Sequence, residues 1–265
     1  MKIHSQLVRD SAEAVTLAAR GTVSAIEGAW LANREAHIVL TGGRTGLAFV
    51  EELDQMLAEL DQKFSEVDHT QSHSASSLST SSHSTSSDST SPSHHIVNIW
   101  FSDERFVDFE SEDRNDTTLK SAFEKSHEFL AFFRSLPPSE ATLSESADGY
   151  DSVLKSEIGT RNFDVVVLSM GEDGHIASCF PGDNAVLQSP LDATAVRNSP
   201  KPPSERVSIT LSRLGMSHLT YIFALGEGKS SALRDTLAGA SSMPITLLRQ
   251  NSPSGDITLI TDITL

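Results

Sequence analysis

The chain has 265 residues, 38% of them hydrophobic, and its 36 acidic and 20 basic residues give a formal charge of −16. This length suits a single domain over residues 1–265, and the acidic charge disfavours nonspecific binding to nucleic acid or to an anionic membrane. With Cys179 as the single cysteine, no apolar run of membrane-spanning length and no signal-like N-terminus, the sequence predicts a soluble, cytoplasmic protein without disulfides.

The first half of the chain predicts two buried strands with a helix between them. The apolar runs "AHIVL" (36–40) and "IVNIWF" (96–101) are typical of strands covered on both faces. In "LAFVEELDQMLAEL" (47–60) the apolar residues recur at helical spacing: Leu47, Val50, Leu53, Leu57 and Leu60. Residues 69–95 are a serine- and histidine-rich insertion with almost nothing to bury, so we expect a disordered linker rather than a metal site.

The second half continues this alternation. Strands are expected in "DVVVLSM" (164–170), "LTYIFAL" (219–225) and a final pair, "PITLL" (244–248) and "DITLI" (256–260), and "GKSSALRDTLAG" (228–239) is expected to be a helix that ends at its glycine. Apolar strands separated by helices predict an α/β fold with a mainly parallel sheet covered on both faces. Ligands of such folds bind at the carboxyl ends of the strands, so the loops after the first three of these strands are the candidate site.

The loop after the first strand is "TGGRTG" (41–46), which contains Gly42, Gly43, Arg44 and Thr45. Paired glycines at a helix start allow backbone N–H groups to approach an anion. A tight turn explains the glycines about as well, and the motif lacks the spacing of a Walker A or dinucleotide-binding loop.

The loop after the second strand lies within "WFSDERFVDFESEDRND" (100–116). It places charged residues among aromatic ones: Asp103, Glu104, Arg105, Asp113 and Arg114. Aromatic neighbours suggest partial burial, where charged side chains must pair or bind a ligand. We therefore favour a functional role over an ordinary polar loop.

The loop after the third strand, within "SMGEDGHIASCFPG" (169–182), contains the strongest candidate for catalysis. A histidine accepts a proton near neutral pH and a nearby carboxylate orients it, so His175 with Asp173 is a candidate general base; the alternative is a loop histidine bonded to backbone. The chain has no serine nucleophile elbow, and too few ligands accompany His175 for zinc. The pattern favours a base that acts on water or on a substrate proton.

Two isolated basic residues follow: Arg206 in "SERVSIT" (204–210) and Lys229 in "GEGKSSAL" (226–233). Isolated basic residues are commonly solvated surface charges. Together with Arg44 and Arg105, these two offer the local positive charge that an acidic protein needs to bind a phosphate.

The motifs "VLTGGRTG", "WFSDERFV", "VVVLSMGEDGHIASCFPG", "ERVSIT" and "GEGK" occur in the order found in the glucosamine-6-phosphate isomerase/6-phosphogluconolactonase family. From about residue 10 to the C-terminus, the chain resembles the lactonase branch of that family. The resemblance implies a three-layer α/β/α fold with a mainly parallel, Rossmann-like sheet. It also implies hydrolysis of a phosphorylated sugar lactone, 6-phospho-D-glucono-1,5-lactone, in the oxidative pentose phosphate pathway, with no metal or organic cofactor.

The resemblance assigns roles to single residues. His175 would be the general base supported by Asp173, while Asp103 and Arg105 would line the sugar and lactone end. The phosphate-binding residues would be Gly42, Gly43, Arg206 and Lys229, and we add Arg44 and Thr45 from the same glycine loop. The family commonly has Ser-Thr where this chain has Arg44-Thr45, so the role of Arg44 is left open.

Two alternatives are retained. A glucosamine-6-phosphate deaminase shares the Asp-Gly-His loop, but that branch favours "DEY" in place of Asp103-Glu104-Arg105 and a glutamate at the position of Phe180. The other alternative is a sugar-phosphate-binding regulator without turnover. The sequence leaves the oligomeric state unknown.

Overall fold

The computed structural model describes residues 3–75, 95–123, 130–134, 142–251 and 256–264. Within these ranges, seven strands form one sheet in the order β1-β10-β9-β6-β2-β3-β5, and all neighbouring strands are parallel. The strands are β1 (Ile3–Leu7), β2 (Ala36–Leu40), β3 (Ile96–Phe101), β5 (Leu130–Arg134), β6 (Phe163–Ser169), β9 (Ser217–Ala224) and β10 (Asp256–Thr261). The predicted mainly parallel sheet is therefore confirmed.

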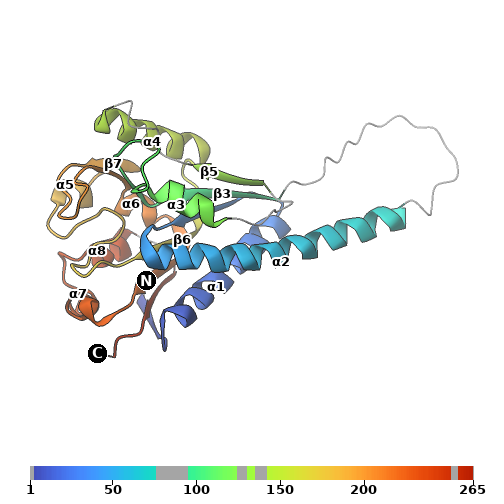
Figure 1. Ribbon diagram of the computed structural model, residues 1–265, viewed down its shortest axis with the longest axis horizontal. Helices are drawn as coiled ribbons and strands as arrows, with labels where there is room; N and C mark the ends of the chain where they lie inside the picture. The colour runs from blue at the N-terminus through green and yellow to red at the C-terminus, as the bar shows by residue number, and fades with distance from the viewer. Residues whose placement is uncertain (1–2, 76–94, 124–129, 135–141, 252–255, 265) are drawn as a thin grey trace.

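Helices cover both faces of the sheet and complete the predicted three-layer α/β/α fold (Figure 1). One face carries α1 (Ser11–Leu31), α2 (Gly43–Ala75) and α3 (Asn115–Ala122). The other carries α4 (Leu143–Glu157), α5 (Asn184–Leu187), α6 (Leu211–Leu214), α7 (Ser230–Leu237), which the short helix η1 (Glu227–Lys229) precedes, and α8 (Pro244–Asn251). A smaller antiparallel sheet packs on this second face, with the order β4 (Asp103–Arg105), β8 (Arg206–Ile209), β7 (Ala193–Val196).

Successive residues of the central strands enter two separate hydrophobic cores. In β2, Ile38 and Leu40 join the core beneath α1 and α2, whereas Val39 joins the core beneath α4 and the smaller sheet. These side chains are almost completely inaccessible to solvent. The strand is a continuous apolar run because both faces of a parallel sheet are covered, so neither set of alternating side chains meets water.

Two long helices lie outside the predicted elements, although their starts are encoded locally. The Asp10 carboxylate accepts a hydrogen bond of 2.9 Å from the Glu13 N–H at the start of α1. At the start of α4, Thr142 and Glu145 form a capping box in which each side chain bonds the other residue's backbone N–H. Such caps satisfy N–H groups that the first helical turn leaves without partners.

Two sequence-based expectations require correction or restriction. The segment "PITLL" is wrong as a strand, because residues 244–248 form the first turns of α8. Ile245 and Leu248, three residues apart, are fully buried in the hydrophobic core, and Pro244 suits a helix start. The disordered linker predicted for 69–95 is wrong for residues 69–75, which are helical because α2 continues to Ala75; residues 76–94 lie outside the described residues.

The order of the strands reverses at β2. From β2 the chain adds β3 and β5 on one side, and it then returns to place β6, β9 and β10 on the other side. The loops that leave the carboxyl ends of β2 and β6 therefore diverge, which is the geometry that opens a crevice in α/β folds. Among the described helices, none has the length and apolarity needed to cross a bilayer.

Candidate active site

A pocket of about 420 Å³ lies at this carboxyl edge. Its walls come from the loops after β2, β3 and β6, from the start of α3, and from the segments around Lys201 and Lys229. Seven predicted site residues line it together: Gly42, Gly43, Asp103, Arg105, His175, Arg206 and Lys229. Asp173 does not line the pocket but is bonded to His175, which does; Arg44 lines an adjoining pocket of about 220 Å³, and Thr45 lines neither.

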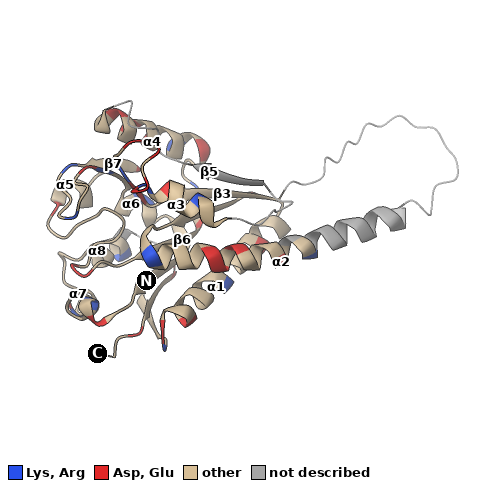
Figure 2. Cartoon of the chain, in the orientation of Figure 1, with Lys and Arg blue, Asp and Glu red and all other residues tan. Residues whose placement is uncertain are grey.

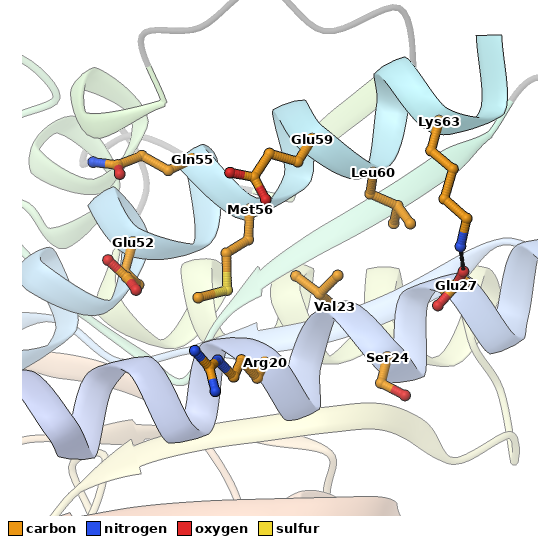
Figure 3. Close-up of a pocket in the computed structure, with 10 residues that line it drawn as sticks. All are labelled: Arg20, Val23, Ser24, Glu27, Glu52, Gln55, Met56, Glu59, Leu60 and Lys63. Atoms are coloured by element: carbon orange, nitrogen blue, oxygen red, sulfur yellow. Dashed lines mark hydrogen bonds and ion pairs between the residues drawn. The ribbon is translucent and has the colours of Figure 1, made fainter. Parts of the chain in front are cut away.

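A larger hollow of about 570 Å³ lies between α1 and α2 (Figure 3). Its lining residues all come from these two helices, and Lys63 on α2 pairs with Glu27 on α1 at 2.5 Å. This hollow contains no histidine in its lining and is set apart from the carboxyl ends of the strands. Chemistry rather than size therefore selects the smaller pocket as the candidate active site.

The side chain of His175 is held by its own loop. Its Nδ1 bonds to the carboxylate of Asp173, and its backbone N–H donates to the same oxygen at 3.3 Å. A neutral imidazole that donates from Nδ1 keeps Nε2 free to accept a proton. Burial opposes ionisation of Asp173, but the hydrogen bond and charge of His175 outweigh it and keep the pKa of Asp173 below its ordinary value. The pair thus combines an ionised carboxylate with an oriented imidazole.

Two neighbours define the place of the imidazole ring. A Cβ atom at Gly171 would lie 2.1 Å from Cε1 of His175, so glycine is needed there to admit the ring. The ring of Phe180 lies 4.6 Å from the imidazole, centroid to centroid, and is 5% exposed. The guanidinium of Arg206 lies 6.0 Å from the centre of the same phenyl ring. Phe180 therefore contacts both the candidate base and a candidate phosphate-binding residue.

Successive side chains of the "DER" motif point to opposite sides of the strand β4. Asp103 and Arg105 face the pocket, whereas Glu104 does not line it. The Asp103 carboxylate accepts hydrogen bonds from the hydroxyls of Ser102 at 3.0 Å and Ser178 at 2.6 Å. It also lies 3.8 Å from Nη1 of Arg206. This buried carboxylate is thus satisfied by hydroxyl groups and a guanidinium at the wall of the pocket.

Glu104 instead stabilises the segment beside the pocket. Its carboxylate accepts hydrogen bonds of 2.8 Å from the backbone N–H groups of Arg105, Asn115 and Asp116. It thereby caps the start of α3, where orphan N–H groups and the helix dipole favour an anion. Burial raises the pKa of Glu104 to about 7 despite these bonds and the nearby charge of Arg114. The cluster predicted from sequence therefore contains both pocket residues and a structural clamp.

Asn115 lines the pocket but was not singled out in the sequence. Its amide donates to the carbonyl of Asp103 at 2.9 Å and accepts from Nη1 of Arg105 at 3.2 Å. A Cβ atom at Gly42 would lie 2.0 Å from its Oδ1, so the glycine makes room for this amide. Gly43 has a positive φ of 79°, a conformation that glycine adopts without strain. No local pattern marks Asn115, because its contacts come from other elements.

Positive charge gathers at this pocket in a chain that is acidic overall. Acidic residues are spread over α1, α2 and α4, whereas a basic segment marks the start of α2, where Arg44 lies (Figure 2). Burial lowers the pKa of Lys229; the nearby charges of Asp262 and Glu172 oppose this shift, and those of Lys201 and Arg44 add to it. Within the described residues, the side chains of Lys229, Lys201 and Arg44 have no hydrogen bond or ion pair. Such a group of unpaired cations is suited to an anionic ligand.

Comparisons with known proteins agree with this architecture. Residues 70–258 match the family model described as glucosamine-6-phosphate isomerases/6-phosphogluconolactonase. The chain is 27% identical to a 6-phosphogluconolactonase of Mycobacterium leprae (strain TN), over 92% of this chain and 90% of that relative. A solved 6-phosphogluconolactonase from Shewanella baltica OS155 is 22% identical, with a TM-score of 0.74 over 98% of both chains. A solved monomeric glucosamine-6-phosphate deaminase is 17% identical, with a TM-score of 0.66 over 98% of this chain and 97% of that one. At these identities the two solved structures establish the fold.

Proposed function

The chain belongs to the glucosamine-6-phosphate isomerase/6-phosphogluconolactonase family, and from this we propose that it hydrolyses 6-phospho-D-glucono-1,5-lactone to 6-phosphogluconate. The relative from Mycobacterium leprae, similar over most of both chains, supports the lactonase branch. We place this reaction, a step of the oxidative pentose phosphate pathway, in the cytoplasm. One observation carries the proposal: His175, oriented by Asp173, shares a pocket with Arg105, Arg206 and Lys229.

The reaction begins with the removal of a proton from water. Nε2 of neutral His175 accepts this proton while the water oxygen bonds to C1 of the lactone. The resulting imidazolium is stabilised by Asp173, whose low pKa keeps it ionised beside the ring. A positioned base of this kind contributes about 10²–10⁴-fold to the rate.

Attack on C1 moves the carbonyl electron pair onto oxygen, and the oxyanion needs donors. Arg105 is the preferred donor, since it lines the pocket and its Nη1 alone is engaged by the described residues, with the Asp113 carbonyl at 2.7 Å and with Asn115. A guanidinium has five N–H groups, so donors are left for the oxyanion. The intermediate then collapses by breaking the bond between C1 and the ring oxygen, and the imidazolium returns its proton to that oxygen. The product is an open-chain acid, and no covalent bond to the protein forms.

The phosphate occupies the cationic side of the pocket. Lys229 and Arg206 supply positive charge there, and the backbone at Gly42 and Gly43 lies at the start of α2, where N–H groups favour an anion. Binding at this end leaves the lactone ring toward His175 and Arg105. Asp103, at the same wall, is placed to accept a hydrogen bond from a sugar hydroxyl.

The test is an assay of the purified protein on freshly generated 6-phosphogluconolactone, with the rate of spontaneous hydrolysis subtracted. We expect turnover well above that background. Release of ammonia from glucosamine 6-phosphate is measured in parallel. Ammonia release without lactonase turnover would assign the protein to the deaminase branch, and binding of 6-phosphogluconate without either reaction would indicate a regulator.

A further inference from the structure

We propose that Lys201 is a substrate-binding residue, and that Arg206 acts on the substrate mainly through Lys201 by fixing the loop that carries it. This inference rests on the proposed function, because it concerns how the same pocket holds the phosphorylated end of the lactone. The sequence predicts neither substrate binding by Lys201 nor loop positioning by Arg206. Lys201 lies in a polar loop without a recognisable motif, "SPKPPSE" (199–205).

The guanidinium of Arg206 is largely engaged with protein atoms. Its Nε donates to the carbonyl of Pro203 at 3.2 Å, and its Nη2 donates to the carbonyls of Lys201 at 3.1 Å and Pro202 at 3.4 Å. Its Nη1 lies 3.8 Å from the carboxylate of Asp103. The residue is only 7% exposed. Three of its contacts therefore hold consecutive carbonyl groups of one loop, and among the described residues only Nη1, beside Asp103, is left for a ligand.

Lys201 has the opposite character. Its backbone is held at both ends: its carbonyl accepts from Arg206, and its N–H donates to the hydroxyl of Ser199 at 3.2 Å. Its side chain is exposed, lines the pocket and has no hydrogen bond or ion pair among the described residues. A fixed backbone with an uncommitted ammonium group is the arrangement expected of a residue that closes over an anion.

The charge of Lys201 acts on both sides of the pocket. It adds to the larger effect of His175 in lowering the pKa of Asp173, and it lowers the pKa of Lys229 against the opposing charges of Asp262 and Glu172. The ammonium group is therefore within electrostatic reach of the candidate base and of the candidate phosphate-binding lysine. A phosphate between Lys201 and Lys229 would relieve their mutual repulsion and give each of them a partner.

The experiment measures binding of 6-phosphogluconate, the unreactive product, by isothermal titration calorimetry. We expect Lys201→Met to raise its Kd about tenfold or more, because a charge-assisted contact is lost. Lys201→Arg should restore most of the affinity. D-gluconate, which has no phosphate, should bind the parent and Lys201→Met equally. In the lactonase assay the same variant should raise KM and leave kcat within about twofold, as expected for a group that binds ground and transition states alike.

A double-mutant cycle tests the role of Arg206. Because Arg206→Lys loosens the loop that presents Lys201, we expect Arg206→Lys and the double variant Arg206→Lys/Lys201→Met to show about the same Kd as Lys201→Met alone. Losses that multiply would mean that Arg206 holds the phosphate itself and would overturn this part. If Arg206→Lys does not fold, the Lys201 series still decides whether Lys201 binds the phosphate.

Arg197→Met is the matched control. Arg197 is an exposed cation just before the same loop, but its guanidinium donates to Ser144 at 2.6 Å and does not line the pocket. The Arg197→Met variant removes one positive charge, as Lys201→Met does, and should leave Kd unchanged. An equal loss of affinity in both variants would mean that only the net charge of the protein matters, which would overturn the proposal. Unchanged binding in Lys201→Met would also overturn it, with lactonase activity intact. A parent protein that binds 6-phosphogluconate through Lys201 but does not hydrolyse the lactone would instead refute the proposed function.

Discussion

Arg105 and Arg206 lie directly opposite each other in the antiparallel pairing of β4 with β8. Like charges at opposed positions destabilise a sheet, and here burial, together with the charge of Arg105, lowers the pKa of Arg206. Asp103 compensates only in part, since its carboxylate lies 3.8 Å from Arg206. Excess positive charge is therefore built into the pocket, and an anionic ligand should stabilise the folded protein.

The first prediction concerns this ligand. We expect 6-phosphogluconate to raise the Tm of the protein by several degrees, because a ligand at 100 times its Kd stabilises the folded state by about 2.7 kcal/mol. Differential scanning fluorimetry against ligand concentration measures the effect. Gluconate at the same concentrations is the control, and an equal shift with both compounds would contradict recognition of the phosphate.

The second prediction concerns the base. His175→Ala should lower kcat by about 10²–10⁴-fold, the contribution expected of a positioned general base. Asp173→Asn should also lower kcat, because an amide cannot stabilise the imidazolium as an ionised carboxylate does. Both rates are measured with spontaneous hydrolysis subtracted, and circular dichroism checks the fold. Near-normal turnover in a folded His175→Ala variant would remove the assignment.

The third prediction separates two glycines. Gly171→Ala should nearly abolish kcat, because the new methyl group would lie 2.1 Å from Cε1 of His175 and displace the ring. Gly28→Ala is the control: this exposed glycine of α1 has no atom within 4 Å of the new Cβ, so stability should rise by about 0.5–1 kcal/mol. Activity and urea unfolding are measured for both. Full activity in Gly171→Ala would show that the ring position does not matter.

The fourth prediction is a pH dependence. Burial lowers the pKa of Lys229, so this residue loses its charge at a lower pH than an ordinary lysine. The affinity for 6-phosphogluconate should therefore fall as the pH rises through this lowered pKa. Lys229→Arg, which stays charged, should retain affinity to higher pH. Product binding is the better measurement, because the lactone opens rapidly by itself in alkali. Parallel pH profiles of the parent and Lys229→Arg would contradict a role for Lys229.

The fifth prediction concerns Phe180. Phe180→Leu should lower kcat by about ten- to a hundredfold with little change in KM, because the imidazole loses the aromatic contact that helps to position it. Phe180→Tyr preserves the ring and should remain close to the parent. The chemical shift of the His175 ring protons, followed by NMR, reports the loss of the aromatic neighbour independently of activity. Equal activity of the leucine and tyrosine variants would show that burial alone suffices.

The central sheet was predictable because each of its strands is marked by its own short run of apolar residues. Runs such as "AHIVL" have apolar residues at every position, which is required when both faces of a strand are covered, and β2 coincides with that run. The same logic misassigned "PITLL". In five residues, the helical spacing of Ile245 and Leu248 cannot be distinguished from a short buried strand. A longer stretch of sequence, such as residues 47–60, shows the helical periodicity of apolar residues that five residues cannot show.

The site was only partly predictable, since its geometry depends on contacts between distant segments. The sequence marked His175 and Asp173 because only Gly174 separates them, and the structure bonds them. It did not mark Asn115 or Lys201, whose positions are fixed by Glu104 and by Arg206 respectively. It also grouped Glu104 with its neighbours, although alternation along β4 turns this side chain away from the pocket.

The helix α2 starts beside the pocket, runs back along the sheet and projects past its amino edge, the edge at which β3 starts at Ile96 (Figure 1). The stretch of chain joining them is thus attached at the pole of the molecule opposite to the chemistry. The helix and the strand at these two points are both held by the hydrophobic core beneath α1 and α2. Substitutions in the last described turns of α2 should therefore affect the stability of that helix rather than turnover, because they lie far from the pocket at its first turn.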